Sequence, residues 1–333
     1  MLLWLGFIIC SLAIIYSGSK LSRYGDIIAE KTGLGGTWIG VVLMGIVTSL
    51  PEVVTGISSV TYANLPNIAV GNVLGACVFN MLTLALLDVF YRPMPISAKA
   101  HHGHVLSAAF GVLLLGIVAL SLFLGNRLFS FGWMGPYSLL FVFIYFIAMK
   151  LIYSYERRQV VAEFIKEQAV ELKYENISIK TAVSKYIINA AIVIVAAVFL
   201  PKVGEGLAKT TGLGQTFVGN IFIAFSTTLP ELTVSIFAVR MGAIDLAIGN
   251  LFGSNIFNIF ALGVFDIVFA KGPILSFVDS AHVISAISAI VMTAIAIIGL
   301  TYRAEKRPLF LAWDSIGILV GYFANLMLLF MMR

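Results

Sequence analysis

Apolar stretches long enough to cross a lipid bilayer follow one another along almost the whole chain, and this pattern limits the possible folds most strongly. A membrane-spanning helix needs about 20 mainly apolar residues. Ten such stretches begin near Leu2, Gly36, Ile68, His104, Trp133, Ala182, Gln215, Asp245, His282 and Leu309. Only 11% of the residues are charged, which is too few to cover a soluble globule. The sequence therefore predicts an all-α integral membrane protein with ten transmembrane helices.

The two halves of the chain repeat one another. Blocks of polar residues and glycines recur in the same order, and one aspartate follows them in each half: 32–40 with 211–219, 48–52 with 227–231, 71–80 with 249–258, and Asp88 with Asp266. The longest polar stretch separates the two sets. We therefore predict a first five-helix repeat at 1–153, a cytoplasmic linker at 154–180 and a second five-helix repeat at 181–333.

Five membrane crossings per repeat is an odd number, so the two repeats are expected to have opposite orientations in the bilayer. Such inverted repeats are typical of secondary transporters. Lysine and arginine favour the cytoplasmic side. With both termini outside a cell membrane, the outer side keeps only Arg127, Lys202, Lys209, Lys271 and Arg333, and all other lysines and arginines lie inside.

Two glutamates, Glu52 and Glu231, lie in the middle of apolar stretches. A carboxylate at the bilayer centre costs at least ~2.5 kcal/mol and usually has a function. Because the two residues are equivalent in the repeat, the symmetry axis is expected to bring them together near the midplane. Two facing carboxylates repel unless a proton or a cation lies between them. One divalent cation would balance both charges.

The residues before each glutamate suit a hard cation. Pro51 and Pro230 cannot donate a backbone hydrogen bond, so each is expected to break its helix and free a carbonyl one turn earlier. Thr48 and Thr227 lie four residues before the glutamates, on the same helical side. Carboxylate, hydroxyl and carbonyl oxygens suit Ca2+ and Na+ and do not suit Zn2+ or Cu+.

The stretches that follow add amides and glycines. Two sets of small or amide residues are spaced by four, so each set lies along one side of a helix: Asn72, Ala76 and Asn80, and Asn250, Ser254 and Asn258. Glycines at 71, 75, 249 and 253 are expected to allow close helix packing. Asp88 and Asp266 follow about 12 Å further along the helix axis, so we expect them to guide cations at the two mouths.

These motifs resemble a known family. Thr-Ser-Leu-Pro-Glu at 48–52 and Thr-Thr-Leu-Pro-Glu at 227–231, each followed by Gly-Asn-x-x-Gly, look like the two alpha repeats of the sodium/calcium exchanger branch of the cation/calcium exchanger superfamily. The proton/calcium branch usually has Gly-Asn-x-x-Glu in place of Ser-Leu-Pro-Glu. The resemblance implies an antiporter that exchanges Ca2+ for Na+ by alternating access.

The resemblance also implies roles for individual residues. Glu52 and Glu231 would be ligands shared by Ca2+ and Na+, and the carbonyls of Thr48 and Thr227 would complete the Ca2+ site. The flanking Na+ sites would be lined by Ser49, Thr228, Ser254, Asn80 and Asn258. Apart from the transported ions and membrane lipid, we expect no cofactor, no nucleic acid and no obligate protein partner.

The chain departs from the family at two places. Many members have an aspartate where this chain has Asn258, and Gly-Ser-Asn is usual where this chain has Gly75-Ala76-Cys77. Ala76 lacks a hydroxyl, and Cys77 is expected to be a small packing residue. These changes leave the counter-ion and the stoichiometry open, so Ca2+/H+ exchange and K+-dependent exchange stay alternatives.

Two other classes of function fit the sequence less well. An intramembrane enzyme would need a nucleophile with a base, but no histidine lies in the middle of an apolar stretch, and neither Ser49 nor Ser254 has a basic partner. A cation channel is the other alternative. A two-fold repeat around one central site suits alternating access better than an open pore.

Overall fold

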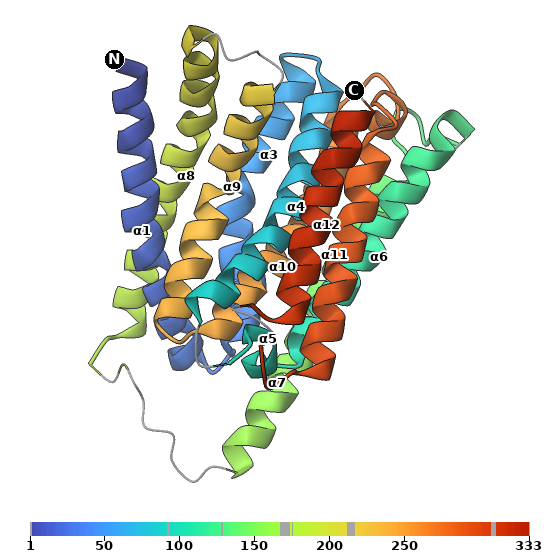
Figure 1. Ribbon diagram of the computed structural model, residues 1–333. Helices are drawn as coiled ribbons and strands as arrows, with labels where there is room; N and C mark the ends of the chain where they lie inside the picture. Colours follow the sequence, from blue (N-terminus) through green and yellow to red (C-terminus); the bar gives the residue numbers. More distant parts are fainter. Residues whose placement is uncertain are drawn as a thin grey trace. The chain divides into compact units, whose positions relative to one another are not determined.

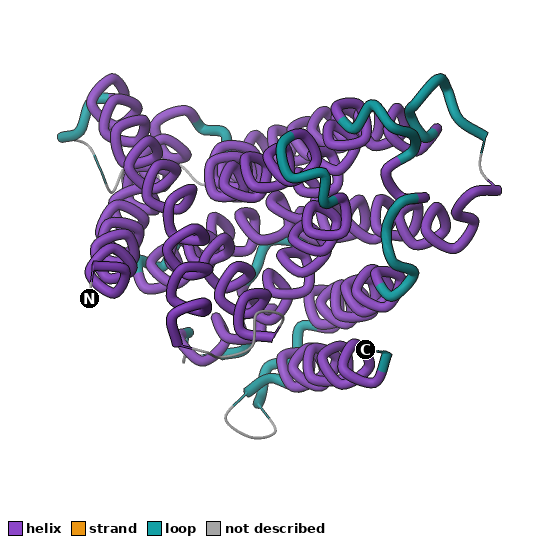
Figure 2. Tube along the Cα trace, turned by 90° about the horizontal axis from the view of Figure 1, so that it is seen from above, coloured by secondary structure: helices purple, strands orange, loops and turns teal. Residues whose placement is uncertain are grey.

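A computed structural model gives the structure of the chain and describes residues 2–91, 94–127, 129–166, 174, 176–211, 217–307 and 311–332. Within these ranges the regular elements are helices: α1 (Leu2–Thr32), α2 (Gly36–Ile39), η1 (Gly40–Met44), α3 (Gly45–Thr61), α4 (Pro66–Phe90), α5 (Ile96–Lys99), α6 (Gly103–Leu124), η2 (Gly125–Arg127), α7 (Pro136–Lys166), α8 (Ile179–Thr211), α9 (Phe217–Arg240), α10 (Ile244–Val268), η3 (Ile274–Ser276), α11 (His282–Tyr302) and α12 (Trp313–Met331). Figure 2 shows this helical composition, and no β-strand occurs in the described part of the chain.

Nine helical segments in the described residues are long and apolar enough to cross a membrane. They correspond to α1, α2 to α3, α4, α6, α7, α8, α10, α11 and α12. The remaining predicted stretch begins near Gln215, which lies outside the described residues. It corresponds to α9, which has 24 residues but is not among the nine. The chain is a multi-pass membrane protein, while the count of ten and the inversion of the repeats stay predictions.

Large apolar side chains on the spanning helices point away from the protein. Leu12 on α1 is 60% exposed, Phe143 on α7 is 65% exposed and Phe323 on α12 is 63% exposed. Apolar surface of this extent is unfavourable in water but has no such cost in hydrocarbon. The exposed side chains therefore fit a lipid environment, as the low charge content predicts.

The chain divides into two compact units, one formed by Met1–Pro51 and Met149–Gly253 and the other by Glu52–Ala148 and Ser254–Arg333. In the first unit, α1, α8 and α9 pack against one another, as Figure 1 shows. In the second unit, α11 packs against α4, α6 and α12. Helices α3, α7 and α10 each contribute to both units. Each unit therefore contains segments of both predicted repeats.

The helices that carry the two glutamates continue through their prolines. Pro51 lies inside α3 and Pro230 lies inside α9. Proline removes one backbone hydrogen bond, but the neighbouring bonds keep the helical path, so the break expected at these residues is absent. The irregularity lies earlier, at Gly40–Met44, where η1 is a π-helical segment between α2 and α3. Such wide turns often occur at functional sites.

Glycines on α10 allow η1 and α2 to approach it within the first unit. A side-chain Cβ at Gly249 would lie 2.8 Å from the carbonyl oxygen of Thr37, and one at Gly253 would collide with the carbonyl oxygen of Val41. The predicted close packing is confirmed for these two residues. At Gly75, the residue equivalent to Gly253, an added Cβ would meet nothing within 4 Å, so the repeats pack differently here.

Candidate ion-binding site

All of the predicted ligand residues are completely buried: Thr48, Ser49, Glu52, Asn80, Thr227, Thr228, Glu231, Ser254 and Asn258. Burial of polar groups in an apolar interior is costly unless they are paired or bind a ligand. The first unit contains Thr48, Ser49, Thr227, Thr228 and Glu231, and the second contains Glu52, Asn80, Ser254 and Asn258. The two sets are described separately below.

In the first unit, Glu231 is held by a hydroxyl from the other predicted repeat. Ser49 Oγ on α3 donates a hydrogen bond of 3.1 Å to Glu231 Oε1 on α9. The second oxygen, Oε2, is buried and has no hydrogen-bond partner among the described residues. Glu231 therefore combines one fixed oxygen with one that a ligand could use. The structure brings Ser49 and Glu231 together, as expected for two residues of one site.

A chain of hydrogen bonds lies beside Glu231. Thr48 Oγ1 is 3.0 Å from the carbonyl oxygen of Met44 and 3.1 Å from Asn250 Oδ1. Asn250 Nδ2 in turn donates to Ser235 Oγ over 3.0 Å. Because the Thr48 hydroxyl is used in these contacts, it positions α3 against α10 within this unit.

Sequence reasoning missed two members of this chain of hydrogen bonds. Asn250 was recognised in the repeated glycine-asparagine motif but was not predicted to lie in the site. Ser235 was not recognised at all. Its position, four residues after Glu231 and thus on the same side of α9, is the signal that could have identified it.

In the second unit, Glu52 lies on α3, one asparagine comes from α4 and two come from α10. Asn80 Nδ2 donates a hydrogen bond of 2.9 Å to Asn255 Oδ1. Asn80 Oδ1 and both amide atoms of Asn258 are buried without a hydrogen-bond partner among the described residues. This unit therefore holds a carboxylate together with amide oxygens, which are hard ligands of the kind that Ca2+ and Na+ prefer.

Asp88 was expected to guide cations at one mouth, but both oxygens of its carboxylate already accept hydrogen bonds from the protein. Oδ1 accepts the backbone N–H of Ile96 at 3.0 Å and lies 2.9 Å from Arg307 Nη2, while Oδ2 accepts the backbone N–H of Ala312 at 2.7 Å. Asp88 is also completely buried. It therefore joins α4 to the first residue of α5 and to the residue before α12, and is not a free guide for ions.

Asp266 has the same role at its own position. Oδ2 accepts hydrogen bonds from the backbone N–H of Gly135, at 2.7 Å, and from the Ser138 hydroxyl. Oδ1 accepts hydrogen bonds from the Tyr137 hydroxyl, at 3.0 Å, and from the backbone N–H of Ile274. The expected role at an ion entrance is therefore not supported for either aspartate.

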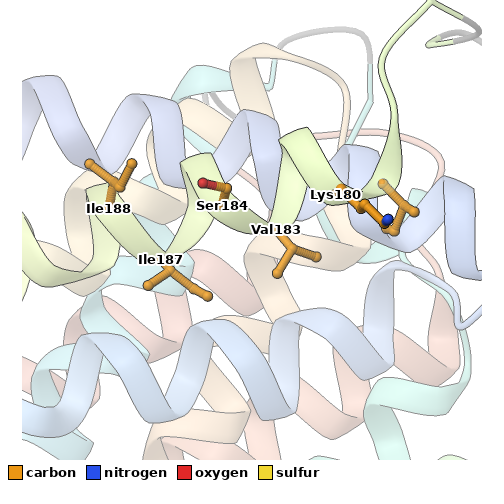
Figure 3. A pocket seen from close by; sticks show the side chains of 6 residues that line it. Lys180, Val183, Ser184, Ile187 and Ile188 are labelled. Carbon is orange, nitrogen blue, oxygen red and sulfur yellow. The ribbon is translucent and has the colours of Figure 1, made fainter.

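Figure 3 shows a groove on α8. It is lined by Ile179, Lys180, Val183, Ser184, Ile187 and Ile188. Ile187 is 60% exposed and Ile188 is 50% exposed, so these side chains suit contact with lipid tails. Within the described residues, no group of three or more His, Cys, Asp or Glu side chains could hold a metal ion. A cation site at the buried glutamates would therefore depend on hydroxyl, amide and carbonyl oxygens in addition to the carboxylates.

Comparison with known proteins gives consistent matches along the chain. The chain is 28% identical over 249 residues to the inner membrane protein YrbG of Escherichia coli, and the match covers 74% of each protein. It is 24% identical over 337 residues to the sodium/calcium exchanger MaX1 of Methanosarcina acetivorans, and the match covers 91% of each protein.

A solved structure of the sodium-calcium exchanger NCX_Mj has the same fold, with a TM-score of 0.72, 22% identity and 98% of both chains covered. The model of the sodium/calcium exchanger protein family matches residues 2–153 and 183–331. These matched ranges include both glutamate motifs and nearly all of the described helices. The chain therefore belongs to the sodium/calcium exchanger family.

Proposed function

We propose that this protein is a secondary antiporter that exchanges Ca2+ for Na+ across a cell membrane by alternating access, with Glu52 and Glu231 as shared ion ligands. One observation carries the proposal. Two completely buried glutamates occupy equivalent positions of a sequence repeat, and each lies in a unit that also buries hydroxyl or amide side chains. Family membership makes cation/Ca2+ exchange the general activity.

Charge balance explains why such a site would couple two ions. Two carboxylates together neutralise one Ca2+, and several Na+ ions could replace it. An empty site would keep two like charges in the bilayer interior, where uncompensated charge is costly. The empty form would therefore change access slowly, and only the loaded forms would carry ions across the membrane.

The remaining ligands follow from the family resemblance. The carbonyls of Thr48 and Thr227 would complete the Ca2+ site. Ser49, Thr228, Ser254, Asn80 and Asn258 would line the Na+ sites. The Ser49 hydroxyl donates its hydrogen to Glu231. The lone pairs of Ser49 Oγ would therefore be left to bind an incoming Na+. We propose ten spanning helices in two inverted repeats, with both termini outside and no cofactor.

The test is uptake of radiolabelled Ca2+ into proteoliposomes driven by an outward Na+ gradient. Glu52→Gln and Glu231→Gln keep side-chain size and remove the charge, so each should abolish uptake while the protein still purifies as a single species. Glu305→Gln is the matched control, because Glu305 is an exposed acid between α11 and α12. Retained exchange in both glutamine variants would refute the proposed site.

A different counter-ion is the second candidate, and two residues favour testing it. Asn258 and Ala76 replace an aspartate and a serine that are usual in the family, so fewer charged or hydroxyl ligands are available for Na+. The same vesicles should therefore be given an outward K+ gradient or a pH gradient in place of Na+. Uptake driven only by the pH gradient would assign Ca2+/H+ exchange, and uptake driven only by the K+ gradient would make K+ the counter-ion. Na+-driven uptake that also requires K+ would assign K+-dependent exchange.

A further inference from the structure

A thiol lies among the ligand residues of the second unit. Cys77 on α4 is completely buried, and its Sγ lies 4.0 Å from the backbone oxygen of Asn255. The side chain of Asn258 lies against the same thiol, and the negative charge of Glu52 acts on it. Cys77 therefore lies beside one of the proposed ligands, Asn258, and interacts electrostatically with another, Glu52.

The repeat explains why Asn258 faces a thiol. Cys77 and Asn255 occupy equivalent positions of the two repeats, and Asn80 and Asn258 are likewise equivalent. Asn80 donates to the amide of Asn255 over 2.9 Å. At the equivalent place, Asn258 faces a thiol and not an amide, and both of its amide atoms are buried and make no hydrogen bond to an oxygen or nitrogen of the described residues. A polar side chain that could bind a ligand is thus directed at the sulfur.

We propose that Cys77, Glu52 and Asn258 form a binding site for soft divalent cations such as Cd2+, in which the Cys77 sulfur is the selective ligand. The inference adds to the proposed ion site and rests on it, because Glu52 is a ligand in both. Oxygen ligands favour Ca2+ and Na+, whereas thiolate ligands favour softer metals. The departure from Gly-Ser-Asn therefore adds a ligand of a different class.

The binding step balances in atoms and charge. The Cys77 thiol loses its proton to water as the sulfur–cadmium bond forms, because a coordinating thiol is deprotonated. The thiolate and the Glu52 carboxylate then neutralise the two positive charges of Cd2+ inside the bilayer. The carbonyl oxygen of Asn258 supplies a further neutral ligand. A site with no net charge is favoured in a medium where uncompensated charge is costly.

The expected consequence is inhibition of exchange. A cation held by a sulfur bond occupies Glu52, so Ca2+ and Na+ cannot use this carboxylate. Release requires a proton to return to the thiolate, and the bound form should therefore persist. Cd2+ should inhibit at lower concentrations than a hard divalent cation of similar size.

The test titrates purified protein with Cd2+ and records the ultraviolet charge-transfer absorption of the cadmium–thiolate bond, alongside Cd2+ inhibition of Ca2+ uptake. Cys77→Ser keeps the shape and removes the soft ligand. Cys10→Ser is the matched control, because Cys10 is the other of the two cysteines and lies on α1 in the first unit. Both variants are compared with the wild type, each normalised to its own activity.

We expect the absorption band in the wild type and in Cys10→Ser but not in Cys77→Ser. Cys77→Ser should also need about tenfold more Cd2+ for half inhibition, equivalent to about 1.4 kcal/mol. An unchanged inhibition curve, or no cysteine-dependent band, would overturn the proposal. The band does not require transport, so it tests the soft-cation site even if Na+-driven uptake fails. If Cys77→Ser does not fold, Cys77→Ala provides the same comparison.

Discussion

Replacement of Arg307 by leucine should destabilise the second unit through one buried ion pair. Arg307 Nη2 lies 2.9 Å from Asp88 Oδ1. The same nitrogen contacts the backbone oxygens of Asp88, Tyr91 and Met94. One guanidinium therefore joins the segment after α11 to the C-terminal end of α4 and the residues that follow it.

The structure sets the expected magnitude. The Asp88 side chain is 0% exposed and that of Arg307 is 15% exposed, so the leucine variant leaves a buried carboxylate without its cation. Breaking such a pair costs about 3–5 kcal/mol. The backbone N–H groups of Ile96 and Ala312 still donate to Asp88, so we expect a loss near the lower value, about 3 kcal/mol.

Arg307→Lys is the matched comparison because it keeps the positive charge but cannot reach the same set of carbonyl oxygens. We expect it to lose about 1 kcal/mol, the usual contribution of a hydrogen bond. Thermal unfolding in detergent, followed by tryptophan fluorescence, should therefore rank the wild type above Arg307→Lys and that variant well above Arg307→Leu. Equal unfolding temperatures for the two variants would show that the buried charge is not the dominant factor.

Two further predictions follow from local geometry. Gly253→Ala should destabilise the protein by about 1–3 kcal/mol because its methyl group meets the Val41 carbonyl oxygen, whereas Gly75→Ala should be neutral or slightly stabilising in the same thermal assay. Burial and the positive charge of Arg303 lower the pKa of His102 from 6.5, so the neutral imidazole is favoured in the folded state and stability from this residue decreases as the pH falls below 6.5. Arg303→Gln should raise the midpoint of the His102 NMR titration, and an unchanged midpoint would contradict the assigned cause.

The class of fold and the candidate ligands could be predicted from the sequence because both depend on the cost of burial in lipid. Apolar stretches long enough to span a bilayer fold as helices. A glutamate inside such a stretch is costly to bury, so it usually has a function. Glu52 and Glu231 were identified on this ground, and both are completely buried. The repeat then marked their polar neighbours, which are buried as well.

The roles of Asp88 and Asp266 could not be predicted from spacing along a helix. Most of their donors come from distant parts of the chain, such as Arg307 for Asp88 and Tyr137 for Asp266, and no local pattern identifies such partners. One donor was within reach of sequence reasoning. Each aspartate accepts the backbone N–H of an isoleucine eight residues later, and Ile96 and Ile274 both follow a proline. This recurrence indicates a shared helix–loop connection and not an ion entrance.

The differences between the repeats are more informative about ion choice than their similarities. Glu52 and Glu231 occupy equivalent positions of the two repeats and are the same residue type. Cys77 and Asn255 also occupy equivalent positions, but there a thiol replaces an amide. Cys77 contacts the backbone of Asn255, so these two equivalent residues are neighbours. If a two-fold axis relates the repeats, residues that touch their own equivalents lie beside that axis. The thiol would then lie beside the axis on which the shared ion is expected, where one change of ligand class has the greatest effect on which cations bind.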